Sequence, residues 1–73
     1  MTLANQLVLA DRLNDAVNLA DGMGYNTCIV NRISSVDEAM FVVDLAYQLG
    51  FSEQIVGSET HTYGSAYWVV VKW

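Results

Sequence analysis

The sequence predicts one small α+β domain in the order helix, strand, helix, strand, strand, with a three-stranded sheet and both helices on one of its faces. Three observations predict this fold. Two segments repeat apolar residues at helical spacing, three segments are rich in β-branched and aromatic residues, and the last of these is apolar on both faces. A strand buried on both faces belongs in the middle of a sheet, which gives the strand order 1-3-2 with the last strand central. With 73 residues, the chain has room for one domain, residues 1–73.

The first helix is expected from Leu3 to Asp21. Thr2 is a suitable N-cap, and Gly22 is expected to supply the left-handed residue that closes the helix. Apolar residues at helical spacing form one stripe that faces the core, and aspartate and asparagine occupy the opposite face. The stripe consists of Leu9, Leu13, Ala16, Val17 and Ala20.

The second helix has the clearest local signals in the chain. A strand from Tyr25 to Ile33 precedes it, because this segment is rich in β-branched and aromatic residues. Ser35 and Glu38 then have the spacing of a capping box, and the helix is expected from Val36 to Leu49, with Gly50 ending it. Its core stripe is expected to consist of Val36, Ala39, Val43, Ala46 and Leu49.

The remainder of the chain is expected to form two strands. Ser52–Ser58 is typical of a short strand, Glu59–Gly64 of a turn region and Ser65–Trp73 of the final strand. A strand–helix–strand unit makes its outer strands parallel, and the final strand inserts between them, antiparallel to both. Side chains of the final strand alternate between Tyr67, Val69, Val71 and Trp73 on one face and Trp68 and Val70 on the other.

Composition and charge exclude several classes of protein. Three Lys and Arg residues against eight Asp and Glu give a net charge of −5, so the basic patch required for direct binding to DNA or RNA is absent. A hydrophobic content of 53% excludes a disordered chain. The single cysteine, Cys28, excludes an intramolecular disulfide, and neither a signal peptide nor a bilayer-length apolar run is found. We therefore expect a cytoplasmic protein with no membrane partner.

The sequence contains no pattern that predicts catalysis, a cofactor or a metal site. His61 is the only histidine, and with Glu59 nearby it is expected to be an ordinary residue of an exposed turn. Cys28 lies in the middle of a predicted strand, where a small buried side chain is the expected role. The segment Gly22–Gly24 follows a helix and lacks the Lys-Ser/Thr ending of a phosphate loop. The protein is expected not to be an enzyme.

Two helix surfaces are candidate sites for a protein partner. On the second helix, Phe41 falls inside the polar stripe, which is typical of an aromatic anchor with an acidic rim; alternatively, the first helix packs across Phe41 and buries it. On the first helix, carboxylates spaced along one face can imitate a row of phosphates; alternatively, they form an ordinary solvated face. The candidate residues are Phe41, Asp37, Asp44 and Gln48 on the second helix, and Asp11 and Asp15 on the first.

The sheet face that the helices leave open is a third candidate. It displays alternate residues of every strand, including Trp68, and an exposed apolar patch of this kind is typical of a partner or self-association site. The sequence therefore also predicts a homodimer formed through this face, with a small ligand enclosed near Tyr25, Tyr63 or Trp68. The alternative is that the first helix wraps around the sheet and covers more of it.

In size, acidity and absence of catalytic motifs, the chain resembles the small single-domain proteins with which phages and mobile elements block host machinery. Anti-CRISPR proteins and inhibitors of host polymerases are examples. The resemblance covers no specific residues and implies no site. It implies a non-enzymatic inhibitor in the host-cell cytoplasm that binds a basic, nucleic-acid-handling protein, because an acidic chain is steered towards a basic surface. The homodimer is the alternative function.

Overall fold

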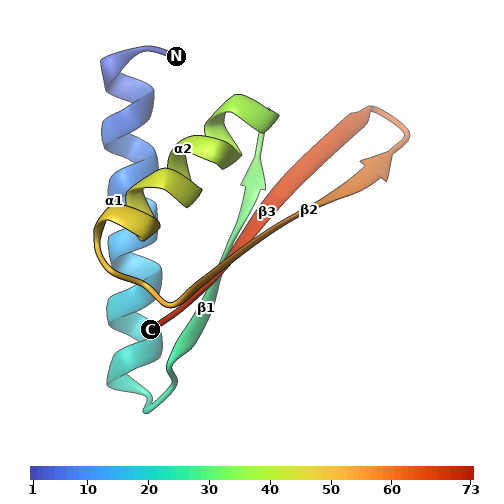
Figure 1. Ribbon diagram of the computed structural model, residues 1–73. Coiled ribbons are helices and arrows are strands. Elements are labelled where there is room, and N and C mark those ends of the chain that lie inside the picture. Colours follow the sequence, from blue (N-terminus) through green and yellow to red (C-terminus); the bar gives the residue numbers. More distant parts are fainter.

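The predicted order of elements and the predicted sheet topology are confirmed by a computed structural model that describes all 73 residues. The strands form one sheet in the order β1-β3-β2, and β3 is antiparallel to both neighbours. Figure 1 shows both helices on the same side of this sheet. The elements are α1 (Leu3–Gly22), β1 (Thr27–Ile33), α2 (Val36–Gln48), β2 (Glu53–His61) and β3 (Gly64–Lys72).

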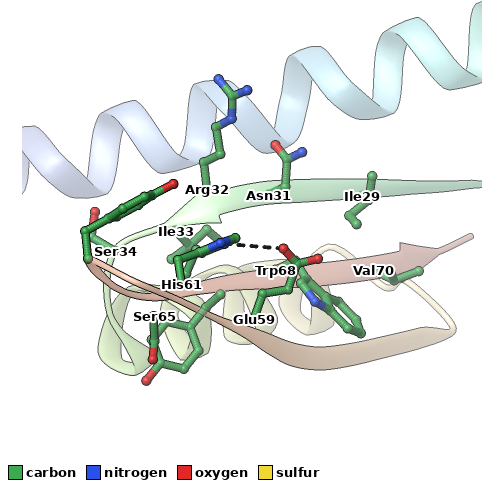
Figure 2. A pocket seen from close by; sticks show the side chains of 13 residues that line it. Ile29, Asn31, Arg32, Ile33, Ser34, Glu59, His61, Ser65, Trp68 and Val70 are labelled. Carbon is green, nitrogen blue, oxygen red and sulfur yellow. Dashed lines mark ion pairs between the residues drawn. The ribbon is translucent and has the colours of Figure 1, made fainter.

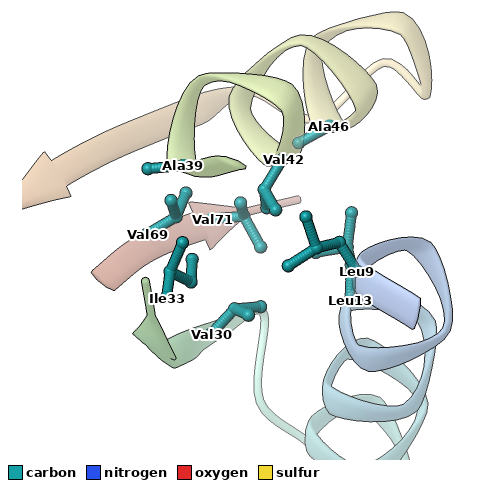
Figure 3. Close-up of a cluster of buried hydrophobic side chains, with 9 residues drawn as sticks. All are labelled: Leu9, Leu13, Val30, Ile33, Ala39, Val42, Ala46, Val69 and Val71. Carbon is teal, nitrogen blue, oxygen red and sulfur yellow. The ribbon is translucent and has the colours of Figure 1, made fainter. Parts of the chain in front are cut away.

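The hydrophobic core lies between the two helices and the sheet (Figure 3). Both helices, β1 and β3 contribute to it. The β2 strand contributes no buried residue, whereas β1, the other edge strand, is covered by α1. The aromatic rings of Phe51 and Trp73 pack beside the cluster, with centroids 5.8 Å apart. The cluster consists of Leu9, Leu13, Val30, Ile33, Ala39, Val42, Ala46, Val69 and Val71.

The predicted core stripe of α2 is partly wrong. Ala39 and Ala46 are buried as expected, but Val36 and Leu49 are 51% and 60% exposed, and Val42 takes the central place with no exposed surface. The apolar arc of this helix is wide enough to contain two overlapping stripes. The helix is rotated so that the stripe through its two alanines, which permits a close approach to the sheet, faces inward.

The N-terminus of α1 is as predicted, but its end is not. The Asn5 N–H donates to Thr2 Oγ1 (3.1 Å), which makes Thr2 the N-cap. Gly22 remains inside the helix, and the left-handed residue is Gly24, with φ +85°. The Tyr25 N–H donates to the carbonyl of Ala20 (2.9 Å), which completes the helix cap. Because this cap engages Tyr25, β1 begins at Thr27 instead of at Tyr25.

Both predicted ends of α2 are confirmed to within one residue. The Glu38 N–H donates to Ser35 Oγ (3.2 Å), and the Glu38 carboxylate accepts from the Ser34 N–H (3.3 Å) instead of from that of Ser35. Gly50 has φ +84°, and the Phe51 N–H donates to the carbonyl of Ala46 (3.1 Å). These contacts form the glycine-based cap that the sequence predicts.

The predicted end of the second strand at Ser58 and the predicted turn region Glu59–Gly64 are wrong. The β2 strand continues to His61, which pairs directly with Gly64, so only Thr62 and Tyr63 form the loop. Gly64 has φ +136°, a conformation that other residues rarely adopt, and it lets so short a loop reverse the chain. His61 is therefore a strand residue near the tip of a long hairpin.

A bulge interrupts β1 near its C-terminal end. Val30 pairs with Val69 and Ile33 pairs with Tyr67, so β1 has one residue more than β3 between these pairs. Arg32, with φ +54°, is the only residue other than glycine in the left-handed region. In a regular strand, Val30 and Ile33 would face opposite sides of the sheet. The extra residue of the bulge lets both face the core, where Ile33 has no exposed surface.

A side chain of α1 contacts this bulge. Arg12 Nη2 donates to the carbonyl oxygen of Asn31. Since a bulge frees main-chain groups from the ladder, this contact satisfies a carbonyl at the irregular position and holds α1 beside β1.

Candidate binding surfaces

The net charge of the protein lies almost entirely on its helices. The strands carry two carboxylates, Glu53 and Glu59, and two cations, Arg32 and Lys72, so their charges cancel. The helices carry six carboxylates against a single arginine, which accounts for the net charge of −5. We call this surface the acidic helix layer; its charged residues are Asp11, Asp15, Asp21, Asp37, Glu38, Asp44 and Arg12.

Every polar residue predicted for partner binding on the helices is exposed. Asp11 and Asp15 lie on the side of α1 opposite the buried Leu9 and Leu13. On α2, the exposed residues are Asp37, Asp44 and Gln48. The structure therefore brings these residues to the outer surface of one layer, and none of them is used in the core.

Phe41, the predicted aromatic anchor, is half-buried and packs against the core cluster. One turn earlier on the same side of α2, Glu38 lines a small hollow together with Val8, Leu9 and Arg12 of α1. Residues three apart share a side of a helix, so Phe41 faces towards α1. This placement favours the alternative in which the first helix packs across Phe41, and it leaves only part of the ring available to a partner.

The sheet face without helices, here called the open face, displays a row of apolar residues. Ile29 of β1 and Ile55 of β2 both pair with Val70 of the central strand, and the two isoleucines are 51% and 53% exposed. Trp68 lies next to this row and stretches across Gly57, where a Cβ atom would overlap the indole ring. Glycine at position 57 is therefore required by the position of the indole. The sequence predicted an apolar open face with alternate residues of every strand, but it did not single out the two isoleucines.

A hollow of about 890 Å³ opens between the end of β1 and the β2–β3 hairpin (Figure 2). His61 Nε2 lies 3.5 Å from Glu59 Oε2, and the imidazole stacks on the ring of Tyr63 with centroids 5.5 Å apart. Trp68 and Arg32 also line the hollow. Of the aromatic residues predicted to lie near a small ligand, Tyr63 and Trp68 are found here. Tyr25, which follows α1 directly, is not among the lining residues.

The chemical groups of a Cys–His catalytic pair are not brought together. Cys28 packs against the core on the helix side of the sheet, whereas His61 lies in the hollow on the open face. Burial raises the pKa of the Cys28 thiol, which disfavours the reactive thiolate. No group of three or more His, Cys, Asp or Glu side chains is arranged to hold a metal ion. Neither helix has the length and apolarity needed to cross a membrane.

Comparison with known proteins finds no match to a protein-family model, to a curated protein or to a solved structure.

Proposed function

We propose that this protein is a non-enzymatic inhibitor whose acidic helix layer occupies a basic, nucleic-acid-handling surface of another protein. The observation that carries the proposal is the separation of charge: the helices hold the whole net charge of −5, and the sheet is neutral. A charge distribution with one acidic side orients the protein as it approaches a cationic surface and raises the association rate.

The spacing of the helix carboxylates supports competition with nucleic acid. Asp11 and Asp15 are one helical turn apart and point away from the core, so their carboxylates follow one another at about 6 Å along the axis of α1. A cationic groove that binds successive backbone phosphates can accept such a row of negative charges. Because these contacts are exposed, raising the salt from 0.1 M to 1 M, which shortens the Debye length from about 10 Å to about 3 Å, weakens them.

The experiment compares three double variants of the immobilised protein in a bacterial lysate at low salt. We expect the wild type to retain a basic protein that soluble duplex DNA displaces, because both compete for one surface. Neutralising either helix pair should reduce retention, whereas neutralising the strand carboxylates should not. Retention that resists DNA, or that is lost equally in all three variants, contradicts the proposal. The variants are Asp11→Asn with Asp15→Asn, Asp37→Asn with Asp44→Asn, and the control Glu53→Gln with Glu59→Gln.

A homodimer is the second candidate, and the exposed apolar surface favours it. Only 10 of the 73 residues are buried, and the accessible surface is 4916 Å², compared with about 4,500 Å² for a typical folded monomer of this mass. Association of two copies would remove part of this surface from water. Sedimentation velocity over a range of concentrations tests this candidate, and a mass that stays at one chain at every concentration contradicts it.

A further inference from the structure

We propose that a second copy of this chain pairs with the free edge of β2, about a two-fold axis at Gly57, and extends the sheet to six antiparallel strands. This inference gives the homodimer of the second candidate a defined surface, which is the strand edge instead of the open face. Apart from Glu53 and Glu59 near its two ends, the edge carries none of the usual protection. Its nine residues, Glu53–His61, pair with β3 without a register shift, and they include no proline, lysine or bulge.

The main chain of β2 has unused hydrogen-bonding groups. In an antiparallel sheet, alternate residues of an edge strand direct their N–H and C=O groups away from the neighbouring strand. Backbone–backbone hydrogen bonds outside the helices and ladders involve none of the residues Glu53–His61. A second β2 strand would satisfy these groups over its whole length.

The opposite edge of the sheet is closed to such pairing. The bulge at Arg32 breaks the regular spacing of β1, and α1 lies beside this strand. Arg12 of α1 also donates to the Asn31 carbonyl at the bulge. Bulges and covering helices are established means of protecting an edge strand, and β2 has neither at its edge.

The sequence of β2 selects one register for the pairing. All nine residues are paired only when Gly57 lies opposite Gly57 of the second copy, and this register places Glu53 opposite His61 and Ile55 opposite Glu59. A shift by one residue would mix the two faces of the sheet. Of the two nearest shifts that keep the faces together, one places Glu53 opposite Glu59, a like-charge pair that is destabilising. The other leaves Glu53 and Gln54 without a partner in the second β2 strand. The full register thus pairs every residue of β2 and avoids the like-charge pair.

An uncharged strip of α2 faces the same side of the molecule as this edge. Val36, Met40 and Tyr47, here called the α2 strip, are 51%, 45% and 74% exposed. They lie about 160° or more around the helix from Glu38 at 100° per residue, and Glu38 faces α1. Since α1 lies over β1 and α2 lies over β3 and β2, the side of α2 away from α1 faces the β2 edge.

Pairing at the edge therefore buries apolar surface on both faces of the extended sheet. On the helix side, Val36 and Met40 of the two α2 strips lie nearest to the two-fold axis, and Asp44 borders each strip on its outer side. On the open face, Trp68 already reaches across Gly57 towards the edge, so the two indole rings approach each other over the two-fold axis. The acidic helix layers of both copies then face the same way and form one larger acidic surface.

The experiment measures self-association of three single variants, each of which replaces an exposed apolar residue by glutamate. Met40→Glu places like charges near the two-fold axis, Ile29→Glu disrupts an open-face dimer, and Leu19→Glu changes an α1 residue that is 69% exposed and remote from both. By sedimentation equilibrium, we expect the wild type to dimerise and Met40→Glu alone to raise the dissociation constant about tenfold or more. A monomeric wild type, or dissociation caused by Ile29→Glu or Leu19→Glu, overturns the proposal.

Two further readouts separate this inference from the inhibitor proposal. Amide hydrogen exchange in β2 should slow as the protein concentration rises, and unchanged exchange in a dimeric sample overturns edge pairing. Salt should leave the apolar self-association intact or strengthen it, because it screens repulsion between acidic chains, whereas salt weakens binding of a basic partner. A monomer that still retains a DNA-displaced protein would refute the dimer alone.

Discussion

The bulge at Arg32 allows a test in which replacement by glycine has opposite effects on the stability of the fold at two neighbouring positions. Arg32 has φ +54° and is exposed, so its side chain can be replaced without disturbing the core. Replacement by glycine removes the steric cost of the left-handed conformation, and replacement by valine increases it, because a β-branched residue is a severe outlier at positive φ.

The magnitudes follow from the backbone conformation. A left-handed residue that carries a Cβ atom costs roughly 1–2 kcal/mol, and glycine loses about 0.5–1 kcal/mol more conformational entropy on folding than alanine. Arg32→Gly should therefore stabilise the fold by about 0.5–1 kcal/mol, which raises Tm by roughly 2–8 °C in a domain of this size. Arg32→Val should lower the free energy of unfolding by about 1 kcal/mol or more.

Urea denaturation followed by far-ultraviolet circular dichroism measures both changes. Asn31→Gly is the matched control, because Asn31 is an exposed neighbour without positive φ, where glycine weakens the strand. We expect stabilisation at position 32 and destabilisation at position 31. If glycine has the same sign at both positions, or if Arg32→Val is as stable as Arg32→Gly, the reasoning from the left-handed backbone is refuted.

Three other substitutions or treatments have defined outcomes. Because burial raises the pKa of Cys28 above its ordinary value of 9.0, alkylation at pH 8 should be slower in the folded than in the urea-unfolded protein, and equal rates would contradict it. The neutral thiol is the favoured form, so its contribution to stability is complete below pH 9 and is lost as the pH rises through the raised value. Gly57→Ala should destabilise the fold by about 1–3 kcal/mol and change the near-ultraviolet dichroism of Trp68; an unchanged spectrum would show that the indole does not cover Gly57. Val42→Ala should lower the free energy of unfolding by about 2 kcal/mol and Val36→Ala by about 0.5 kcal/mol or less. Equal losses of stability in thermal unfolding would support the core stripe of α2 that the sequence predicts.

The topology was predictable because its signals are local and strong. The capping residues Thr2, Ser35 and Gly50 mark helix ends by their own hydrogen-bonding and backbone preferences. The continuous apolar composition of β3 is sufficient to place this strand in the centre of the sheet.

The features that were not predictable depend on tertiary packing. An arginine at a left-handed position has no sequence signal, so the bulge at Arg32 could not be anticipated. The loop of Thr62 and Tyr63 lacks the Asn-Gly or Asp-Gly pair that usually marks a two-residue hairpin, so β2 was expected to end early. The wide apolar arc of α2 concealed the exposure of Val36, and with it the α2 strip.

The candidate sites, like the fold, were predictable only in part. Asp11, Asp15, Asp37 and Asp44 could be assigned to the surface because a carboxylate is rarely buried without a partner. The burial of Phe41 depends on how the helices cross, which no local pattern determines. Partner binding through any of these residues stays a prediction.

The position of β3 between the other two strands also sets the order in which the protein can fold during synthesis. β1 and β2 do not pair with each other, and every ladder in the sheet includes β3, which the ribosome makes after both. Strand pairing must therefore wait until β3 has left the exit tunnel, while the helices, whose hydrogen bonds are local, can form earlier. Until that moment β1, which leaves the ribosome well before β3, has no strand partner, and its unpaired edges are open to other nascent chains.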